Sequence, residues 1–265
     1  MPPPPPSPWP HYAWAAGHLL LLVCAIKYLV SIFTFKAASN VIWYKLSYAG
    51  ALISYAIVCF KAVGMPQASP QYAQRALADE NVQYFLLSLY WFLTRPIFPS
   101  LIPFATFSAF HTLTFVRTNI IPKILPSKPP PPAQPGQPAP RAEQHPYAKA
   151  IGTWVRNNYE SAMQIVAFAE LVIFAYVSVG ALIRRNSLLT PVIYAHFLRQ
   201  RYMFSSFTRQ AVNAFTAAAD ARINAPGSPP WLQQGWVAIK LAGARWAAAI
   251  PGGTPAAQPQ QERRR

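Results

Sequence analysis

The chain has 265 residues, of which 53% are hydrophobic and only 11% carry a charge. Soluble domains usually carry about 25% charged residues, so this composition argues against a soluble domain and for a polytopic membrane protein. The net charge is +16, from 23 lysines and arginines against 7 acidic residues. Because the basic residues mostly flank apolar runs, they suit phosphate headgroups better than nucleic acid, and we expect no nucleic-acid partner.

The N-terminal part of the chain predicts a stiff head followed by a helical hairpin. Residues 1–12 are proline-rich and are expected to form a disordered, extended head. Two apolar runs follow, Trp14 to Phe35 and Val41 to Val63, with a short polar break between them. Each run is long enough to cross a bilayer, which needs about 20 apolar residues. Lys27 interrupts the first run and is expected to snorkel towards a headgroup.

The longest apolar stretch runs from Val82 to Val116 and is broken near its middle by Arg95 and Pro96. Proline lacks a backbone N–H and disfavours helix in the residue before it, so the chain must kink or turn there. The stretch is either one long broken helix or a hairpin. With the preceding runs it gives a predicted membrane domain over residues 13–118, built of two helical hairpins.

Residues 119–146 are proline-rich and predict a disordered linker, followed over 147–189 by an interfacial helix and a transmembrane helix. The interfacial helix is expected at Tyr147 to Glu160 and the span at Ala162 to Ile183. Glu170 lies near the centre of that span, where a carboxylate is a functional-site hypothesis by default. It either pairs with Lys27 or Arg95 or is protonated, and we favour a hydrogen bond that fixes helix packing.

The bias of basic residues predicts that the C-terminus is cytosolic, because eleven basic residues face two acidic ones from Arg184 onwards. The linker before the span is also basic, which would place both ends of Ala162–Ile183 in the cytosol. Either that segment is re-entrant, or the sparse charges of the linker do not influence the orientation of the span.

The region 190–250 predicts amphipathic helices that lie on the membrane surface, followed by a disordered basic tail at 251–265. Thr190 is expected to cap a first helix that continues as one apolar stripe to Ile223, and a second helix is expected from Trp231 to Ile250. The residues predicted to contact the membrane surface, with its anionic headgroups, are Phe197, Arg199, Phe204, Phe207, Arg209, Phe215, Trp231, Leu232, Trp236, Ile239, Lys240, Arg245 and Trp246.

The sequence lacks the residue patterns of an enzyme. The histidines are scattered and no metal-ligand or nucleophile motif is present, so we expect no catalytic residue, metal or cofactor. Cys24 and Cys59 lie inside apolar runs and are interpreted as small buried hydrophobic residues. The alternative to a scaffold is a small transporter or channel that uses four intramembrane polar residues, although no internal repeat supports it. Those residues are Lys27, Arg95, His111 and Glu170.

Three stretches together resemble the transmembrane protein 33 family, which includes the pore-membrane protein of the nuclear envelope. The order and spacing agree over roughly Leu19 to Arg222, and the polyproline head and proline-rich linker depart from the family pattern. The first stretch is Gln74-Arg75-Ala76-Leu77 with Asp79-Glu80, Tyr84 and Leu86 to Leu89. The second is Ile97-Phe98-Pro99 with Phe107-Ser108, His111 and Leu113. The third is Pro191 to Tyr194 with Phe197-Leu198 and Arg201-Tyr202.

The resemblance implies an all-α integral protein of the endoplasmic reticulum membrane and nuclear envelope. Family members help to shape curved membrane, work with reticulon-type proteins and influence nuclear pore assembly, so the resemblance implies these partners and nucleoporins. Membrane-binding amphipathic helices near the C-terminus are also a family trait. We therefore predict a non-enzymatic membrane-shaping protein that supports nuclear pore organisation, for which a homo-oligomer is an open option.

Overall fold

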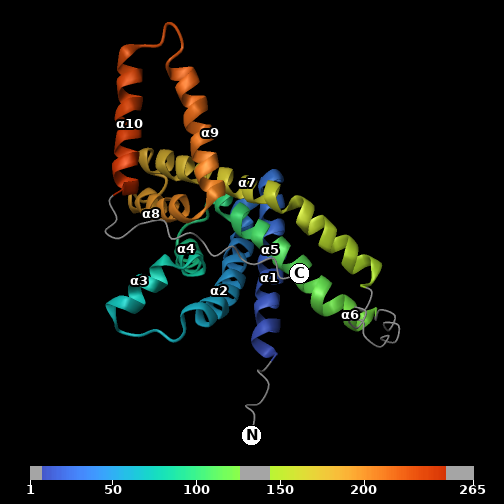
Figure 1. The fold of residues 1–265 in the computed structure, drawn as a ribbon. Helices are drawn as coiled ribbons and strands as arrows, with labels where there is room; N and C mark the ends of the chain where they lie inside the picture. Colours follow the sequence, from blue (N-terminus) through green and yellow to red (C-terminus); the bar gives the residue numbers. More distant parts are fainter. Residues whose placement is uncertain (1–7, 126–143, 249–265) are drawn as a thin grey trace, which may run out of the picture. The chain divides into compact units, whose positions relative to one another are not determined.

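The computed structural model describes residues 8–125 and 144–248, and every regular element in these two ranges is a helix (Figure 1). This agrees with the predicted all-α class. The chain divides into two compact units, residues 1–163 and 164–265, so the long helix α7, Pro146–Leu182, contributes to both. Within the two described ranges, three segments are long and apolar enough to cross a membrane: Trp9–Phe33, Ala37–Val63 and Pro146–Leu182. The protein is therefore an all-α membrane protein.

The first unit begins with the predicted hairpin, formed by α1, Trp9–Phe33, the short 3₁₀ turn Ala37–Asn40, and α2, Val41–Val63. The two helices cross at two glycines. A Cβ atom on Gly50 would lie 2.6 Å from the carbonyl oxygen of Gly17, and one on Gly17 would lie 2.8 Å from that of Gly50. Small residues let membrane helices approach closely, which explains glycine at both positions.

The predicted head is wrong in its extent, because α1 begins at Trp9 rather than after residue 12. Pro10 occupies the first turn of the helix, where the missing N–H would have had no partner in any case. Residues 1–7 of the predicted head lie outside the described residues.

Two capped helices follow: α3, Pro70–Ala78, and α4, Glu80–Leu93. The Ser69 side chain accepts a hydrogen bond from Tyr72 N, and Asp79 Oδ1 accepts from the backbone N–H groups of Asn81 and Val82. These side chains satisfy N–H groups that have no partner within their own helix.

The predicted break at Arg95-Pro96 is confirmed, because α4 ends at Leu93 and α5, Leu101–Phe115, follows a 3₁₀ turn at Phe98–Ser100. Lys45 of α2 donates hydrogen bonds to the carbonyl oxygens of Phe92 and Thr94, and so caps the exposed end of α4. The two halves do not form a simple second hairpin, because α4 packs mainly on α2 and α5 mainly on α1.

A buried hydroxyl group secures the turn between the two halves. Ser100 Oγ donates to the carbonyl oxygen of Ile97 at 2.6 Å. Its single proton is thereby used, so Tyr44 and Tyr48 of α2 both donate to it, at 3.1 and 2.7 Å. All three side chains are almost completely buried.

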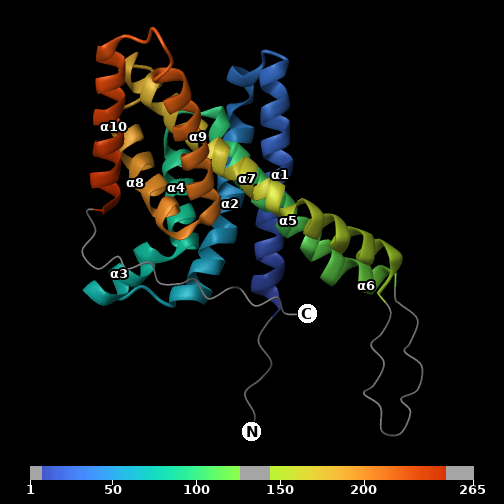
Figure 2. The same ribbon diagram turned by 45° about the horizontal axis from the view of Figure 1, so that its top comes forward.

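Helix α5 continues through a π-helical segment, Val116–Ile120, into the short α6, Ile121–Ile124. The predicted linker therefore starts too early, at residue 119, and its central part, 126–143, lies outside the described residues. The N-terminal part of α7 runs beside α5 and α6 (Figure 2), with Phe110 against Trp154 and Tyr159 at 5.8 and 6.0 Å between ring centroids. The prediction of an interfacial helix separate from the transmembrane helix is wrong, because α7 is continuous from Pro146 to Leu182.

The second unit contains the C-terminal part of α7, then α8, Leu189–Phe204, α9, Ser206–Ile223, and α10, Pro230–Ala248. The predicted single helix to Ile223 is wrong, because the chain is extended at Ser205, whose side chain accepts from Thr208 N and starts α9. Thr190 is not the cap of α8 but lies inside it, and Ser187 Oγ accepts from Leu189 N instead. Residues 249–265, with the predicted tail, are outside the described part.

Candidate functional site

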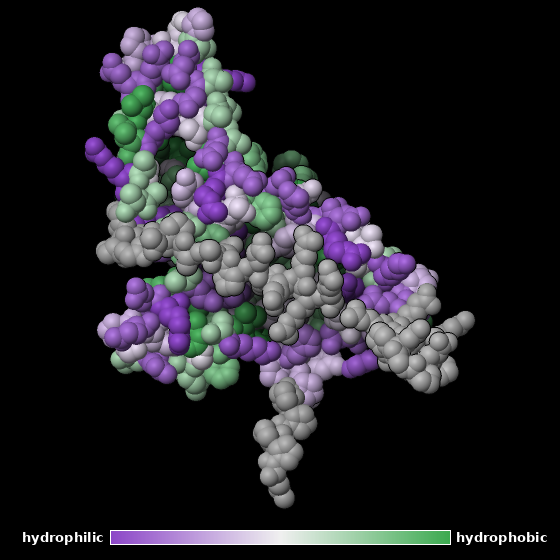
Figure 3. Space-filling view, viewed as in Figure 1, coloured by the Kyte–Doolittle hydropathy of each residue, from purple (hydrophilic) through white to green (hydrophobic). Residues whose placement is uncertain are grey.

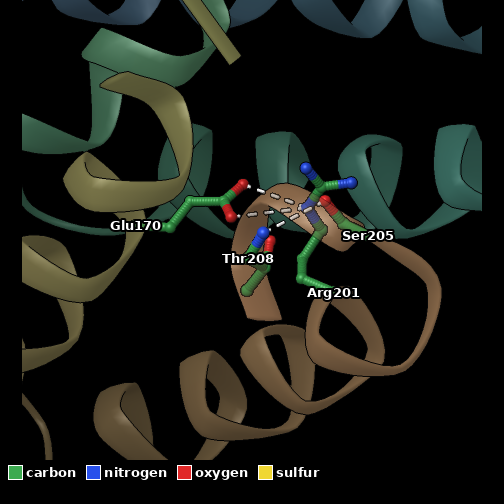
Figure 4. A network of polar contacts seen from close by, with 4 residues as sticks. All are labelled: Glu170, Arg201, Ser205 and Thr208. Carbon is green, nitrogen blue, oxygen red and sulfur yellow. Dashed lines mark hydrogen bonds and ion pairs between the residues drawn. The ribbon is translucent and has the colours of Figure 1, made fainter. Parts of the chain in front are cut away.

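A buried ion pair joins α7 to α8 in the second unit (Figure 4). Arg201 Nε lies 3.2 and 3.4 Å from the two carboxylate oxygens of Glu170, and the side chains are 6% and 0% exposed. The two residues lie at matching depths, because Glu170 is twelve residues before the end of α7 and Arg201 is twelve after the start of α8. At 1.5 Å per residue each lies about 18 Å from the turn.

The partner of Glu170 corrects the sequence expectation. We expected Lys27, Arg95 or a proton, whereas the structure pairs the carboxylate with Arg201. The reason is register, since the turn between α7 and α8 returns the chain along the same helix. Asn186 Nδ2 donates to the carbonyl oxygen of Val177 at 3.0 Å and holds that turn closed. The favoured role for Glu170, a packing contact between helices, agrees with this geometry.

The break between α8 and α9 lies against the same ion pair. The backbone N–H of Ser205 donates to the carbonyl oxygen of Arg201 at 2.8 Å, and Ser205 Oγ accepts from Thr208 N at 3.3 Å. Ser205 and Thr208 are both buried (Figure 4). Loss of either Glu170 or Arg201 would leave an uncompensated charge in this interior. We therefore expect disruption of the ion pair to disturb the start of α9 as well.

The other candidate polar residues of the transport alternative occupy separate places in the first unit. The ammonium group of Lys27 lies 3.6 Å from the centre of the Trp43 ring, whereas Arg95 is exposed at the turn after α4. His111 packs on His18, with 4.5 Å between ring centroids, and His18 in turn hydrogen-bonds Ser108 at 2.9 Å. His18 and Lys27 are about 14 Å apart along α1, so Lys27 lies well away from the His18–His111 pair.

Helices α9 and α10 form a hairpin closed by one carboxylate. Asp220 Oδ1 accepts hydrogen bonds from Trp236 Nε1 at 2.6 Å and from Lys240 Nζ at 2.7 Å. These bonds to Lys240 and Trp236 hold the pKa of Asp220 below its usual value. The Phe215 ring lies near Trp236, at 6.5 Å between centroids. Trp236 and Lys240 therefore face α9 rather than the surroundings of the hairpin.

The outer side of α10 carries large exposed apolar residues. Trp231, Ile239 and Trp246 are 72%, 64% and 47% exposed. At 100° per residue they fall within about 80° of one another, on one side of the helix. Figure 3 shows hydrophobic surface on this hairpin beside hydrophilic residues. These three residues, here called the outer stripe, belong to the predicted membrane-contacting set and lie on the side of α10 away from α9, and Trp246 also contacts Arg199 of α8.

The remaining predicted surface residues fall into three groups by exposure. The prediction that Phe197 contacts the membrane surface is wrong, because its side chain is 5% exposed and packs on Tyr194, with 5.5 Å between ring centroids. Those that are partly buried are Arg199, Phe204, Phe207, Leu232, Trp236 and Lys240. Those that are exposed are Arg209, Phe215, Arg245 and the outer stripe. The predicted stripe member Ile250 lies outside the described side chains.

Two of the predicted arginines have structural contacts. Arg209 Nη1 donates to the carbonyl oxygens of Tyr202 and Met203 at 3.1 and 2.9 Å, which satisfies the last turn of α8. The guanidinium group of Arg199 stacks on the Trp246 ring at 4.9 Å and ties α10 to α8.

Sequence reasoning missed Arg201 and Asp220 as partners. Asp220 had a usable signal, because it is the only acidic residue between Glu170 and Glu262 among many basic ones. Arg201 gave none, since it is one of several arginines in the segment. Within the described ranges, no three histidine, cysteine or acidic side chains gather into a possible metal site.

Comparison with known proteins gives a family match across most of the chain. Residues 10–242 match the family model described as Transmembrane protein 33/Nucleoporin POM33. Nucleoporin POM33 of Chaetomium thermophilum is 34% identical over 241 residues, which cover 87% of this chain and 83% of that protein.

Two further yeast relatives match over similar lengths. Tetra-spanning protein 1 of Schizosaccharomyces pombe is 29% identical over 257 residues, covering 94% of this chain and 88% of that protein. Pore membrane protein of 33 kDa of Saccharomyces cerevisiae is 27% identical over 247 residues, covering 87% and 81%. No solved structure matches the chain.

Proposed function

Because the chain belongs to the family of transmembrane protein 33 and nucleoporin POM33, we propose that it is a non-enzymatic protein of the nuclear envelope and endoplasmic reticulum membrane. In this proposal it shapes or stabilises curved membrane and supports nuclear pore organisation. The names of two relatives, Nucleoporin POM33 and Pore membrane protein of 33 kDa, support the link to the pore. Its partners are then the lipid bilayer, nucleoporins and, by family resemblance, reticulon-type proteins.

The outer stripe of α10 is the observation that carries the membrane-shaping proposal. An apolar stripe with tryptophan at its ends, beside the exposed Arg245, is typical of a helix that lies in a bilayer interface. A helix inserted in one leaflet adds area to that leaflet alone, and curvature relieves the mismatch. Arg245 favours anionic headgroups, and the basic bias of the C-terminal region supports a cytosolic side for this arm.

The test uses the full-length protein in giant vesicles that contain anionic lipid and from which a narrow membrane tube is pulled. We expect the protein to be enriched several-fold in the tube over the flat membrane. Ile239→Glu should abolish the enrichment, since it puts a charge into the outer stripe. The matched control is Ala248→Glu, which introduces the same charge at an exposed position on the opposite side of α10 from Ile239 and Trp246 and should retain wild-type enrichment.

Equal density of the wild-type protein in tube and flat membrane would overturn the shaping proposal. Loss of enrichment in both variants would also count against the outer stripe, because charge alone would then explain the effect.

A further inference from the structure

We propose that a cavity between the end of α5–α6 and the start of α7 binds the phosphate of a phospholipid headgroup. The cavity has a volume of about 230 Å³ and lies wholly within the first unit. Its polar lining comes from Arg117, Thr118, Gln144 and His145. This site is independent of the outer stripe and of the membrane-shaping proposal.

A helical irregularity creates the cavity. Pro122 has no N–H to bond the carbonyl oxygen of Thr118, and its ring crowds that carbonyl. The helix widens instead, and the N–H of Ile121 bonds Val116 five residues earlier, which is the π-helical turn. Such turns frequently occur at functional sites. The wider turn carries Arg117 and Thr118, both of which line the cavity.

The guanidinium group of Arg117 lies against Gly152 of α7. A Cβ atom on Gly152 would lie 2.6 Å from Arg117 Nη1, so glycine at this position lets the guanidinium group lie directly against α7. Guanidinium is a planar multiple donor that suits phosphate oxygens. Arg117 thus supplies a positioned positive charge at one wall of the cavity.

His145 also lines the cavity, and a hydrogen bond to its ring defines its tautomer. Its Nδ1 accepts a hydrogen bond from the backbone N–H of Tyr147 at 3.3 Å, so Nδ1 carries no proton. The proton of the neutral imidazole is therefore on Nε2, which leaves Nε2–H as a donor. Gln144 adds an amide donor beside it.

The surrounding charge favours an anion. Described residues 114–125 and 144–160 contain four basic residues, Arg117, Lys123, Lys149 and Arg156, and one acidic residue, Glu160. A phosphate-bearing ligand fits this environment, whether the phosphate is free or belongs to a lipid.

Position and lining favour the lipid. Trp154 and Tyr159 are 50% and 49% exposed on α7, as expected for aromatic residues at the headgroup level. The cavity begins one to two helical turns before Trp154, and its floor is apolar, made of Ile121, Pro122 and Ala148. Its volume is below the about 300–1,000 Å³ that encloses a drug-sized ligand, so it holds the headgroup and glycerol region while the chains stay in the bilayer.

The test measures lipid retained by the delipidated full-length protein in detergent, using native mass spectrometry. Phosphatidic acid is added back, with diacylglycerol as the matched lipid that lacks phosphate and inorganic phosphate as the free source. We expect retention of phosphatidic acid, little retention of diacylglycerol, and at least a tenfold weaker affinity for phosphatidic acid in Arg117→Gln. Arg117→Lys, which keeps the charge but loses the planar donor, should fall between the two.

Arg156→Gln is the matched control, because it removes one exposed basic charge from the same helix system outside the cavity, and it should bind as the wild type does. Elution of each variant on size exclusion shows that it is folded. Equal loss in Arg117→Gln and Arg156→Gln would overturn the site, as would equal retention of diacylglycerol. Binding of inorganic phosphate without phosphatidic acid would overturn the lipid assignment.

Discussion

Replacing Glu170 by glutamine tests the buried ion pair most directly, because it leaves the charge of Arg201 in the interior. The guanidinium group cannot lose its proton, and Arg201 is only 6% exposed, so neither deprotonation nor contact with water would relieve the buried charge. Removal of one partner of a buried pair typically costs about 3–5 kcal/mol. For a chain of this size about 1 kcal/mol shifts the unfolding midpoint by roughly 2–4 °C, so we expect Glu170→Gln to lower it by about 6–20 °C.

The assay is thermal unfolding of the full-length protein in detergent, followed by circular dichroism. A second substitution, Arg201→Met, removes the stranded charge, and the double variant should recover most of the loss, since apolar replacements of whole pairs are often neutral. Lys149→Gln, on the exposed side of α7, serves as the control and should change stability by less than about 0.5 kcal/mol.

Two outcomes would refute this reasoning. A Glu170→Gln variant that unfolds within about 2 °C of the wild type would mean that the guanidinium group reaches water, against the buried geometry. A double variant as unstable as the single one would mean that shape, not charge, determines the effect.

Three further perturbations follow from contacts described above. Gly50→Ala should destabilise the α1–α2 hairpin by about 1–3 kcal/mol through a backbone clash, whereas Gly235→Ala, in open space, should not; equal thermal shifts would contradict this. Lys45→Met should cost about 1–3 kcal/mol in the same assay by exposing unpaired carbonyls, and an unchanged midpoint would count against the cap. Because hydrogen bonds from Lys240 and Trp236 lower the pKa of Asp220, the stability that Asp220 gives to the α9–α10 hairpin is complete above its ordinary pKa of about 4 and is lost as the pH falls through the lowered pKa. Spin labels on α9 and α10 should move apart over that pH range. An unchanged distance would show that the Asp220 contacts do not hold the two helices together.

The sequence predicted the helical class, the first hairpin and the break at Arg95-Pro96, because long apolar runs and prolines act locally. It did not predict that α4 and α5 pack on α2 and α1 rather than on each other. That choice depends on Tyr44, Tyr48 and Lys45 of α2, whose hydroxyl and ammonium groups reach the turn about fifty residues later in the chain. Local patterns carry no information about such pairing.

The candidate site was predicted in part, because periodicity locates an apolar stripe but not the neighbour that covers it. Trp236 belongs to the same predicted stripe as Ile239, yet it faces α9, and Phe197 of the first predicted stripe is buried. The partner of Glu170 was equally out of reach, since several arginines satisfy its chemistry and only the α7–α8 register selects Arg201. Ser205, by contrast, is a helix cap whose signal was present in the sequence.

The extended backbone at Ser205 sets the direction in which α9 leaves α8. Helix α9 is 18 residues long, so its far end lies about 27 Å from the backbone torsion at Ser205, which is next to the Glu170–Arg201 pair. A change of 10° in that torsion would sweep the far end of α9 by up to about 5 Å, and α10 would travel with it through Asp220. A small change of angle at Ser205 is thus magnified along α9, and the stacking of Arg199 on Trp246 between α8 and α10 opposes it.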